Sequence, residues 1–336
     1  MLRLFTNQQG VIDSGAPYFR LVCLSYLPMG IAGALCGMLR AVEVVRITLY
    51  AVLVAVITNI FFNWMFIFGR LGAPELGARG AALGTVIARI CECTIVLIYA
   101  FRVQTRVPLK LREIWRAPGY LWRDFAKFGL PVAVGDAQWA LVGAFKGMII
   151  GRLSQEMIAA NGVAENFMTM GMTFTGALSV GACVAIGKTV GEKDYDRTRE
   201  YSVKIQRMFV CVGVFMAAVV FLARGLFVSI MQVSADTQAL AMQLIAIGAV
   251  TLIGTTYHAS CFVGINRGAG DGKFVFWVDL ICGWLVVLPL TWLCAFVAKL
   301  PMPLIFLSLR IDQCFKWIIA FFRLRGDKWI RNVTRE

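Results

Sequence analysis

Long apolar stretches recur along this chain of 336 residues, each close to the roughly 20 residues that a helix needs to cross the hydrocarbon core of a bilayer. They cover approximately Ala16–Leu39, Ile47–Phe68, Ala81–Phe101, Phe128–Gly151, Met157–Gly187, Ile205–Ala223, Ala239–Ile265, Phe274–Ala298 and Pro303–Phe322. Lipid offers no hydrogen-bond partner to open backbone groups, which favours helices, and the alternating pattern of a transmembrane barrel is absent. Only 15% of the residues are charged, against about 25% in soluble domains. The sequence therefore predicts an all-α polytopic membrane protein with about nine transmembrane helices.

The net charge is +14, and the positions of the basic residues along the chain fit a membrane topology rather than a nucleic-acid-binding surface. If the helices alternate in direction and the C-terminus is cytoplasmic, most Lys and Arg residues fall in connections on the cytoplasmic side. The connections on the opposite side carry only Arg3, Arg70, Arg79, Arg152, Arg224 and Lys299. This bias predicts a multi-pass protein of the cell membrane, with its N-terminus outside and its C-terminus in the cytoplasm. Its partner is the lipid bilayer, and no nucleic-acid partner is expected.

The sequence gives no support to metal or enzyme chemistry. Cys91-Glu92-Cys93 lacks metal-ligand spacing, and His258, the only histidine, cannot complete a zinc site. A His-Glu-x-x-His pair is absent, and so is the carboxylate cluster that binds Mg²⁺ in polyprenyl-transferring enzymes. We therefore expect neither an enzyme nor a bound metal or cofactor.

Two segments resemble each other and indicate a parallel internal repeat. In each, an apolar stretch ends in a connection with glycine and arginine, Gly37–Glu43 in the first copy and Gly264–Asp271 in the second. Three apolar stretches precede the shared segment in the second copy and none does so in the first, so we expect three helices to be missing relative to a symmetric ancestor. Chance similarity between the two connections is the alternative.

A long basic connection with the turn-prone Ala117-Pro118-Gly119 separates the two halves. We predict a partial N-terminal lobe of three helices over residues 1–104 and a cytoplasmic linker over residues 105–122. A complete lobe of six helices follows over residues 123–323, with a cytoplasmic tail over residues 324–336. Met1–Ser14 is too polar to be a cleavable signal peptide.

Several short motifs occur in order along the chain. They are Asn59-x-x-x-Asn63 followed by Gly69, Gly72–Ala82, Phe128–Pro131, Ile158–Asn161, Arg267–Asp271 and Lys328–Asn332. By these motifs the chain resembles the multidrug and toxic compound extrusion (MATE) transporters. The resemblance implies two six-helix lobes around a central cavity, with the helices of this chain corresponding to family helices four to twelve. It also implies an antiporter that exports organic, cationic drugs or toxic metabolites in exchange for Na⁺ or H⁺.

Ionisable side chains at membrane depth are costly, so each is a candidate for function. Four residues are candidates for coupling to the cation: Asp136, His258, Glu165 and Asp279. Asp136 lies about one helical turn from Trp139, which stands where the resemblance places the usual coupling glutamate. The alternatives are a carboxylate hydrogen-bonded between helices for Asp136 and a neutral, hydrogen-bonded side chain for His258.

Polar and aromatic residues on the same helices are candidates to line the substrate cavity. They are Gln138, Trp139, Asn161, Asn166, Asn59 and Asn63. The asparagines can instead form hydrogen bonds between helices.

Three pairs of opposite charge are predicted to be structural. They are Lys146 with Glu165 on consecutive helices, and the local pairs Arg89 with Glu92 and Asp312 with Lys316.

Two other functions remain open. A lipid-linked oligosaccharide flippase of the same superfamily would need a cavity lined with Arg and Lys for pyrophosphate, and the intramembrane cations are few in this sequence. A truncated, non-transporting remnant would follow from the missing helices, unless a missing N-terminal segment or a partner completes the first lobe.

Overall fold

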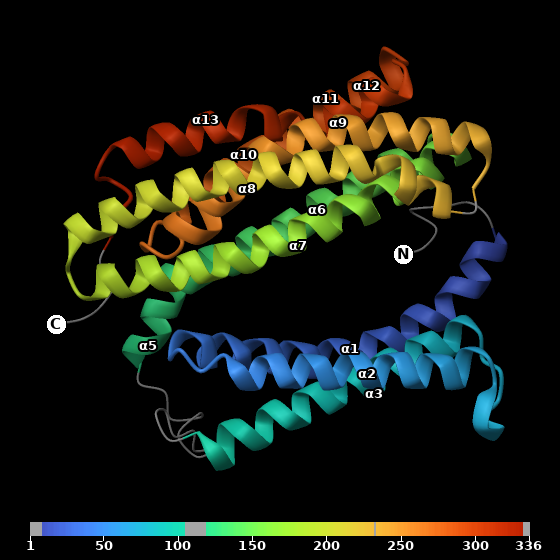
Figure 1. Cartoon of the computed structure of the whole chain (residues 1–336), viewed down its shortest axis with the longest axis horizontal. Helices are drawn as coiled ribbons and strands as arrows, with labels where there is room; N and C mark the ends of the chain where they lie inside the picture. Colours follow the sequence, from blue (N-terminus) through green and yellow to red (C-terminus); the bar gives the residue numbers. More distant parts are fainter. Residues whose placement is uncertain (1–8, 105–118, 232, 332–336) are drawn as a thin grey trace. The chain divides into compact units, whose positions relative to one another are not determined.

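The computed structural model describes residues 9–104, 119–231 and 233–331, and all regular structure in these ranges is helical. The chain divides into two compact units (Figure 1). Unit 1 comprises Met1–Gly119 and unit 2 comprises Tyr120–Glu336. Most of the predicted linker over residues 105–122 lies outside the described residues.

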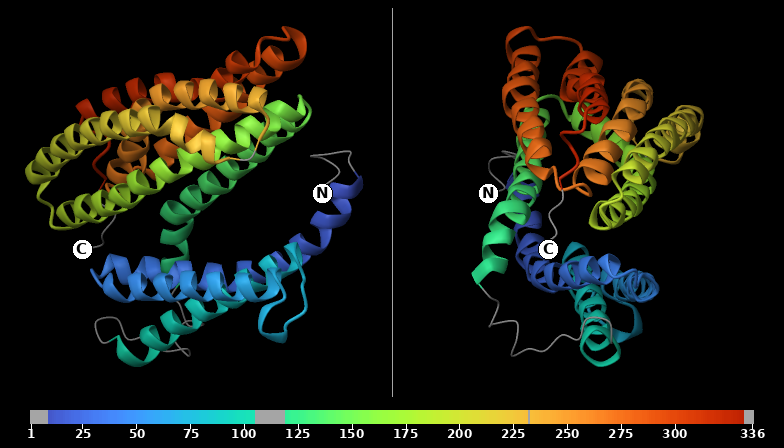
Figure 2. Two further views of the ribbon diagram at one scale, coloured as in Figure 1. Left: turned by 45° about the vertical axis from the view of Figure 1, so that its right-hand side comes forward. Right: turned by 90° about the vertical axis from the view of Figure 1, so that its left-hand side faces the viewer.

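Unit 1 contains three long helices that lie side by side (Figure 2). They are α1 (Gln9–Ala41), α2 (Arg46–Ile67) and α3 (Ala78–Ile98), with the 3₁₀ turn η2 (Arg70–Gly72) before α3 and the π-helical η3 (Tyr99–Val103) after it. The α3 helix packs against both α1 and α2. Small residues allow this approach, because a Cβ atom on Gly80 would lie 2.5 Å from the Phe66 carbonyl oxygen of α2. The α3 helix is therefore the packing centre of unit 1.

Unit 2 begins with the short α5 (Gly119–Asp124) and the π-helical η4 (Phe125–Gly129), followed by three long helices. These are α6 (Leu130–Gly151), α7 (Gln155–Gly191) and α8 (Tyr195–Ile230). The next helix, α9 (Ala235–Ala259), continues into the π-helical η5 (Ser260–Asn266). The remaining elements are α10 (Gly272–Ile281), η6 (Cys282–Val287), α11 (Leu288–Trp292), η7 (Leu293–Val297), α12 (Met302–Leu309) and α13 (Ile311–Arg325).

Short polar side chains start three of the long helices in unit 2. The Ser154 side chain accepts a hydrogen bond from the Met157 backbone N–H at the start of α7. Asp194 caps α8 and Ser234 caps α9 in the same way. Each cap satisfies a backbone donor that the first turn of a helix leaves without a partner.

The α9 helix lies at the core of unit 2, packed against α7, α8 and α13. Its Leu244, Ile245 and Leu252 side chains are fully buried in an apolar cluster. Where its continuation η5 ends, a Cβ atom on Gly268 would lie 2.7 Å from the Cys183 carbonyl oxygen, so glycine lets this connection approach α7. Close packing through small residues is typical of helices in lipid.

Eight helical segments among the described residues are long and apolar enough to cross a membrane, and the chain is an all-α polytopic membrane protein. The ninth predicted helix, Pro303–Phe322, is divided into α12 and α13 at Arg310, whose backbone angles are φ −116° and ψ 11°. The prediction of one continuous helix here was wrong. The physical reason is that side chains from other helices bind the backbone and the charge at the break, so the chain can leave helical geometry within an apolar segment.

Candidate functional site

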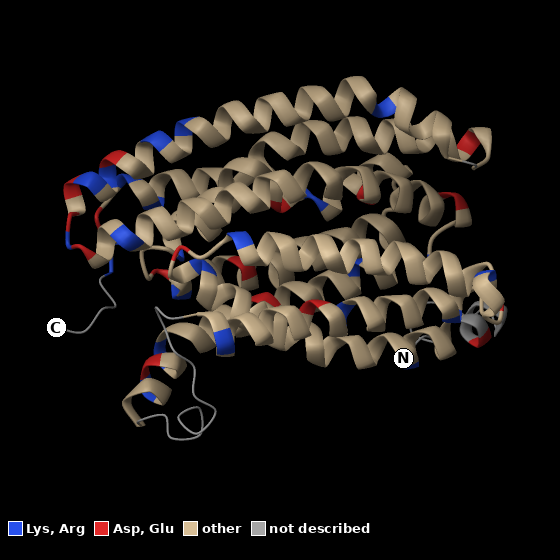
Figure 3. Cartoon of the chain, turned by 60° about the horizontal axis from the view of Figure 1, so that its bottom comes forward, with Lys and Arg blue, Asp and Glu red and all other residues tan. Residues whose placement is uncertain are grey.

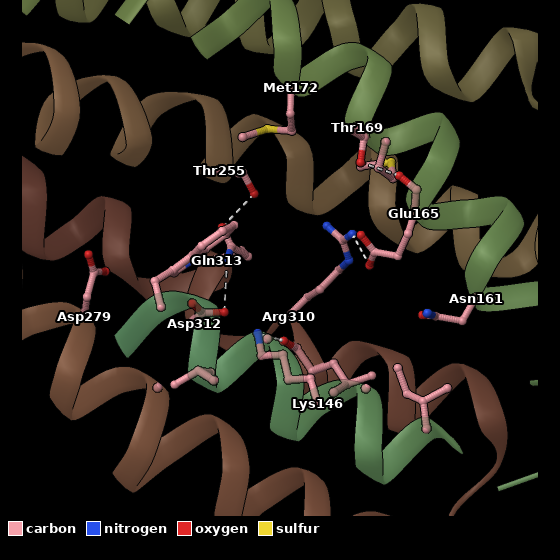
Figure 4. Close-up of a pocket in the computed structure, with 18 of the residues that line it drawn as sticks. Lys146, Asn161, Glu165, Thr169, Met172, Thr255, Asp279, Arg310, Asp312 and Gln313 are labelled. Atoms are coloured by element: carbon pink, nitrogen blue, oxygen red, sulfur yellow. Dashed lines mark hydrogen bonds and ion pairs between the residues drawn. The ribbon is translucent and has the colours of Figure 1, made fainter. Parts of the chain in front are cut away.

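A cavity of about 470 Å³ lies within unit 2 (Figure 4). Its lining comes from α6, α7, α9, α10, η6, α12 and α13, together with the break between the last two helices. Six ionisable side chains line it: Lys146, Glu165, Asp279, Arg310, Asp312 and Lys316. Charged groups within membrane-spanning helices are costly unless they are paired, so the partners of these six side chains define the chemistry of the cavity.

The helix break provides the first set of partners. The Lys146 ammonium of α6 donates a hydrogen bond of 2.8 Å to the Leu309 carbonyl, which is the last residue of α12. Arg310 reaches from the break to Glu165 of α7, with 2.7 Å between guanidinium nitrogen and carboxylate oxygen. Figure 4 shows the Arg310 and Glu165 side chains pointing toward one another. The interrupted helix is thus held by side chains from distant parts of the sequence. Lys146 is 163 positions from Leu309, and Glu165 is 145 positions from Arg310.

A second set of partners surrounds Lys316 of α13. Its ammonium lies 2.9 Å from an Asp279 oxygen of α10 and 3.0 Å from an Asp312 oxygen one turn earlier on α13. Asp312 also accepts a hydrogen bond from the side chain of Gln313, which in turn accepts one from Thr255 of α9. The Lys316 side chain is only 5% exposed, so this triad is nearly shielded from solvent.

The six ionisable groups carry equal numbers of positive and negative charges when all are ionised. Three buried polar atoms around the cavity have no partner among the described residues: Gln138 Nε2, Asn161 Oδ1 and Arg310 Nε. Glu165 is the most accessible of the acids, with 49% of its side chain exposed. The cavity thus combines three carboxylates that are paired with Arg310 or Lys316, a lysine that binds a backbone carbonyl, and hydrogen-bonding atoms without a partner among the described residues.

The cavity brings together five of the predicted site residues. Glu165 and Asp279 provide carboxylates, and Gln138, Trp139 and Asn161 also line it. Gln138 accepts a hydrogen bond of 3.2 Å from the Trp284 indole N–H, whereas Trp139 is largely exposed.

Two other coupling candidates lie outside the residues that line the cavity. Asp136 forms an ion pair of 2.7 Å with Arg267, and 62% of its side chain is exposed. His258 is buried, and its ring Nδ1 lies 2.9 Å from the Gly254 carbonyl oxygen one turn earlier on α9.

The remaining candidates are asparagines. Asn166 is exposed on α7 and does not line the cavity. Asn59 and Asn63 belong to α2 of unit 1, where Asn63 donates to Asn59 and Asn59 donates to Thr85 of α3. The bond from Asn59 to Thr85 connects α2 with α3, which is the alternative that the sequence left open for the asparagines, whereas the bond from Asn63 to Asn59 lies within α2.

The predicted ion pairs were partly right. Arg89 pairs with Glu92 at 2.6 Å, and Asp312 pairs with Lys316 as the local spacing predicts. The predicted pair of Lys146 with Glu165 was wrong, because Glu165 binds Arg310 and Lys146 binds the Leu309 carbonyl. The break between α12 and α13 supplies the Arg310 guanidinium as a partner for Glu165 and the Leu309 carbonyl as a partner for Lys146.

Arg310 is the one ionisable residue lining the cavity that sequence reasoning missed. A signal for it existed, because Arg310, Asp312 and Lys316 are three charges in a single apolar segment, where each is a candidate for function by default.

Comparison with known proteins agrees with this arrangement of helices. A family model described as MatE matches residues 1–65 and 131–293. The chain is 25% identical over 288 residues to the probable multidrug resistance protein NorM of Agrobacterium fabrum, covering 83% of this chain and 61% of that protein. It is 25% identical to the uncharacterized transporter YisQ of Bacillus subtilis, covering 88% of this chain and 65% of that protein. The chain thus spans less than two thirds of the length of these relatives.

Solved structures show the same fold. The eukaryotic MATE transporter AtDTX14 superposes with a TM-score of 0.86 at 16% identity, covering 99% of this chain and 73% of that one. An outward-facing multidrug resistance MATE family transporter of the MOP superfamily superposes with a TM-score of 0.79 at 16% identity, covering 92% and 68% of the two chains. Since the family model matches more than half of the residues, this chain belongs to the MATE family.

Proposed function

We propose that this chain acts in secondary active export of organic compounds, and that the cavity of unit 2 is where the compound and the coupling cation, Na⁺ or H⁺, compete. The observation that carries the proposal is the membrane-embedded cavity of about 470 Å³ with three carboxylates, each within reach of an internal cation. Relatives described as multidrug resistance proteins support the direction of transport.

Glu165 is the group at which such a competition is easiest. It is the most exposed acid of the cavity, and it lies one helical turn from Asn161, whose Oδ1 has no partner among the described residues. Carboxylate and amide oxygens suit Na⁺, and a proton on Glu165 would remove its attraction for Arg310. Either ion would release the Arg310 guanidinium, so ion binding would change the contacts at the break between α12 and α13.

The substrate most compatible with this site is an organic cation. A cationic group can take the place of Arg310 at Glu165, while the apolar parts of Trp139 and Met172 provide contact surface. Completion of the first lobe by a further segment or a partner stays a prediction, and so does the location in the cell membrane with a cytoplasmic C-terminus.

The test is efflux of an ethidium-like dye from membrane vesicles that contain the chain, in the presence of a Na⁺ or a pH gradient. We expect Glu165→Gln to abolish the dependence of efflux on the gradient. The matched control is Glu156→Gln, which changes an exposed acid in the first turn of the same helix, outside the cavity. Gradient-dependent efflux equal in the two variants would refute the role of Glu165. Asp136→Asn, measured alongside, tests the candidate that lies outside the cavity lining.

A flippase for an anionic, lipid-linked oligosaccharide is the second candidate, and one observation favours it. The cavity gathers three of the few intramembrane cations of the sequence, Lys146, Arg310 and Lys316. Such groups can bind pyrophosphate if their internal partners release them. Under this alternative, Lys146→Met would abolish movement of a pyrophosphate lipid across vesicle membranes, and dye efflux would be absent from the unmodified chain.

A further inference from the structure

A second cavity, of about 530 Å³, lies on unit 2 between α8 and the C-terminal part of α13. One wall is apolar and consists of Val203 and Val210 from α8 with Phe321 and Leu324 from α13. Trp329, which follows α13 and is only 1% exposed, also lines it. We call this cavity the α8–α13 groove. It shares no lining residue with the cavity described above.

Arginines give the α8–α13 groove an excess of positive charge. Arg199, Arg207 and Arg325 line it, and Asp327 is the one acid among its lining residues. Asp327 is already engaged, because its carboxylate lies 3.0 Å from Arg199. Arg207 and Arg325 are exposed and have no carboxylate partner among the described residues. The groove thus offers two guanidinium groups to an anion.

The polar groups deeper in the groove are satisfied within the protein. The Tyr257 hydroxyl donates a hydrogen bond of 2.7 Å to the Gln206 side chain, and Gln206 donates one of 3.1 Å to Ser202. Arg325 lies over the Phe321 ring, with 4.3 Å from the guanidinium carbon to the ring centroid. The hydrogen-bond donors of the groove that are available to a ligand are therefore those of its arginines, which lie next to an apolar wall.

The position along the helices corresponds to a membrane interface. Arg207 lies twelve residues after the start of α8, and beyond it the exposed face of this helix is apolar, with Phe215 and Leu222 at 65% and 81% exposure. The exposed Phe322 of α13 is likewise followed by Arg323 and Arg325. Lys and Arg gather at this end of unit 2, around the start of α8 and the end of α13 (Figure 3). Both helices thus change from apolar to basic surface beside the groove.

We propose that the α8–α13 groove binds an anionic phospholipid of the surrounding membrane. The lipid phosphate accepts hydrogen bonds from Arg207 and Arg325, and an acyl chain packs against Val203, Val210 and Phe321. Guanidinium groups match phosphate geometry, and basic pockets between transmembrane helices suit anionic headgroups. A soluble phosphate compound would leave the apolar wall in contact with water, which is why the occupant is a lipid. This binding does not depend on the transport proposed above.

The test is titration of the delipidated, detergent-purified chain with phosphatidylglycerol and with phosphatidylcholine, followed by native mass spectrometry. We expect phosphatidylglycerol to bind more tightly, and the double variant Arg207→Gln/Arg325→Gln to bind it about 10- to 30-fold more weakly, since each cation near a lipid headgroup contributes modestly. The matched control is Arg224→Gln, the same change toward the other end of α8, outside the groove. This variant should retain the affinity of the unmodified chain.

A second variant keeps the proposal falsifiable if the glutamine variant is unstable. Arg207→Lys/Arg325→Lys preserves both charges and should retain binding within about threefold. Equal affinity for the two lipids, or unchanged phosphatidylglycerol binding by the glutamine variant, would overturn the proposal. So would glycerol 3-phosphate binding as tightly as phosphatidylglycerol, because a free phosphate would then be the ligand.

Discussion

Replacing Lys316 with methionine provides a direct test of the charge arrangement in the cavity of unit 2. The Lys316 ammonium is 5% exposed and bridges Asp279 at 2.9 Å and Asp312 at 3.0 Å. Methionine preserves much of the side-chain volume but leaves two shielded carboxylates without their cation. Removing one partner from a buried ion pair costs about 3–5 kcal/mol, because the remaining charge stays desolvated.

This loss of stability can be measured in detergent as a decrease of the melting temperature, with tryptophan fluorescence as the signal of unfolding. For a domain of about 150–250 residues, 1 kcal/mol shifts the melting temperature by about 2–4 °C, so we expect Lys316→Met to lower it by about 6–20 °C. Lys204→Met is the matched control, since Lys204 also pairs with an acid four residues away on a helix but is exposed. Exposed pairs contribute little, so this control should melt with the unmodified chain.

A compensated variant separates the loss of charge balance from the loss of a lysine. Lys316→Met combined with Asp279→Asn and Asp312→Asn removes the whole triad, and neutral replacements of buried ion pairs are often tolerated. We expect this triple variant to recover most of the lost melting temperature. If it melts as low as Lys316→Met, or if Lys316→Met melts like the Lys204→Met control, charge compensation in the cavity is refuted.

Three further predictions concern packing, the C-terminal segment and topology. Gly80→Ala should destabilise unit 1 by about 1–3 kcal/mol, because the new methyl group would meet the Phe66 carbonyl oxygen, and the melting temperature reports this loss. Asp271 is fully buried and forms ion pairs with Arg323 and Arg331, so Asp271→Asn should weaken both contacts. Limited trypsin digestion should then cleave the C-terminal segment that contains these arginines faster. In a cysteine-free background, Arg152→Cys should react with a membrane-impermeant maleimide in intact cells, and Asp327→Cys only after the cells are permeabilised.

Each of these predictions has a control or a contrary outcome. Gly37→Ala changes a glycine of unit 1 with open space around it and should leave the melting temperature unchanged. Asp236→Asn changes an exposed acid and should leave digestion of the C-terminal segment unchanged. Labelling of Asp327→Cys in intact cells would reverse the proposed topology.

Much of the fold follows from the sequence because its signals are local. A helix crosses lipid when about 20 consecutive residues are apolar, and this can be counted along the chain. The pairs Arg89 with Glu92 and Asp312 with Lys316 could be predicted for the same reason, since residues three or four positions apart lie on one face of a helix. The motifs that resemble MATE transporters are also local, and the family match agrees with them.

The tertiary structure alone decided which charges meet in the cavity. Glu165 pairs with Arg310, 145 residues away, and Lys316 pairs with Asp279, 37 residues away. These distances depend on how each helix is rotated and tilted in its bundle, which a pattern of apolar residues does not specify. The break at Arg310 is likewise a tertiary effect, because the side chain that binds the Leu309 carbonyl comes from α6. An apolar segment determines that a helix can form, whereas partners from other helices determine where it is interrupted and which of its charges are compensated.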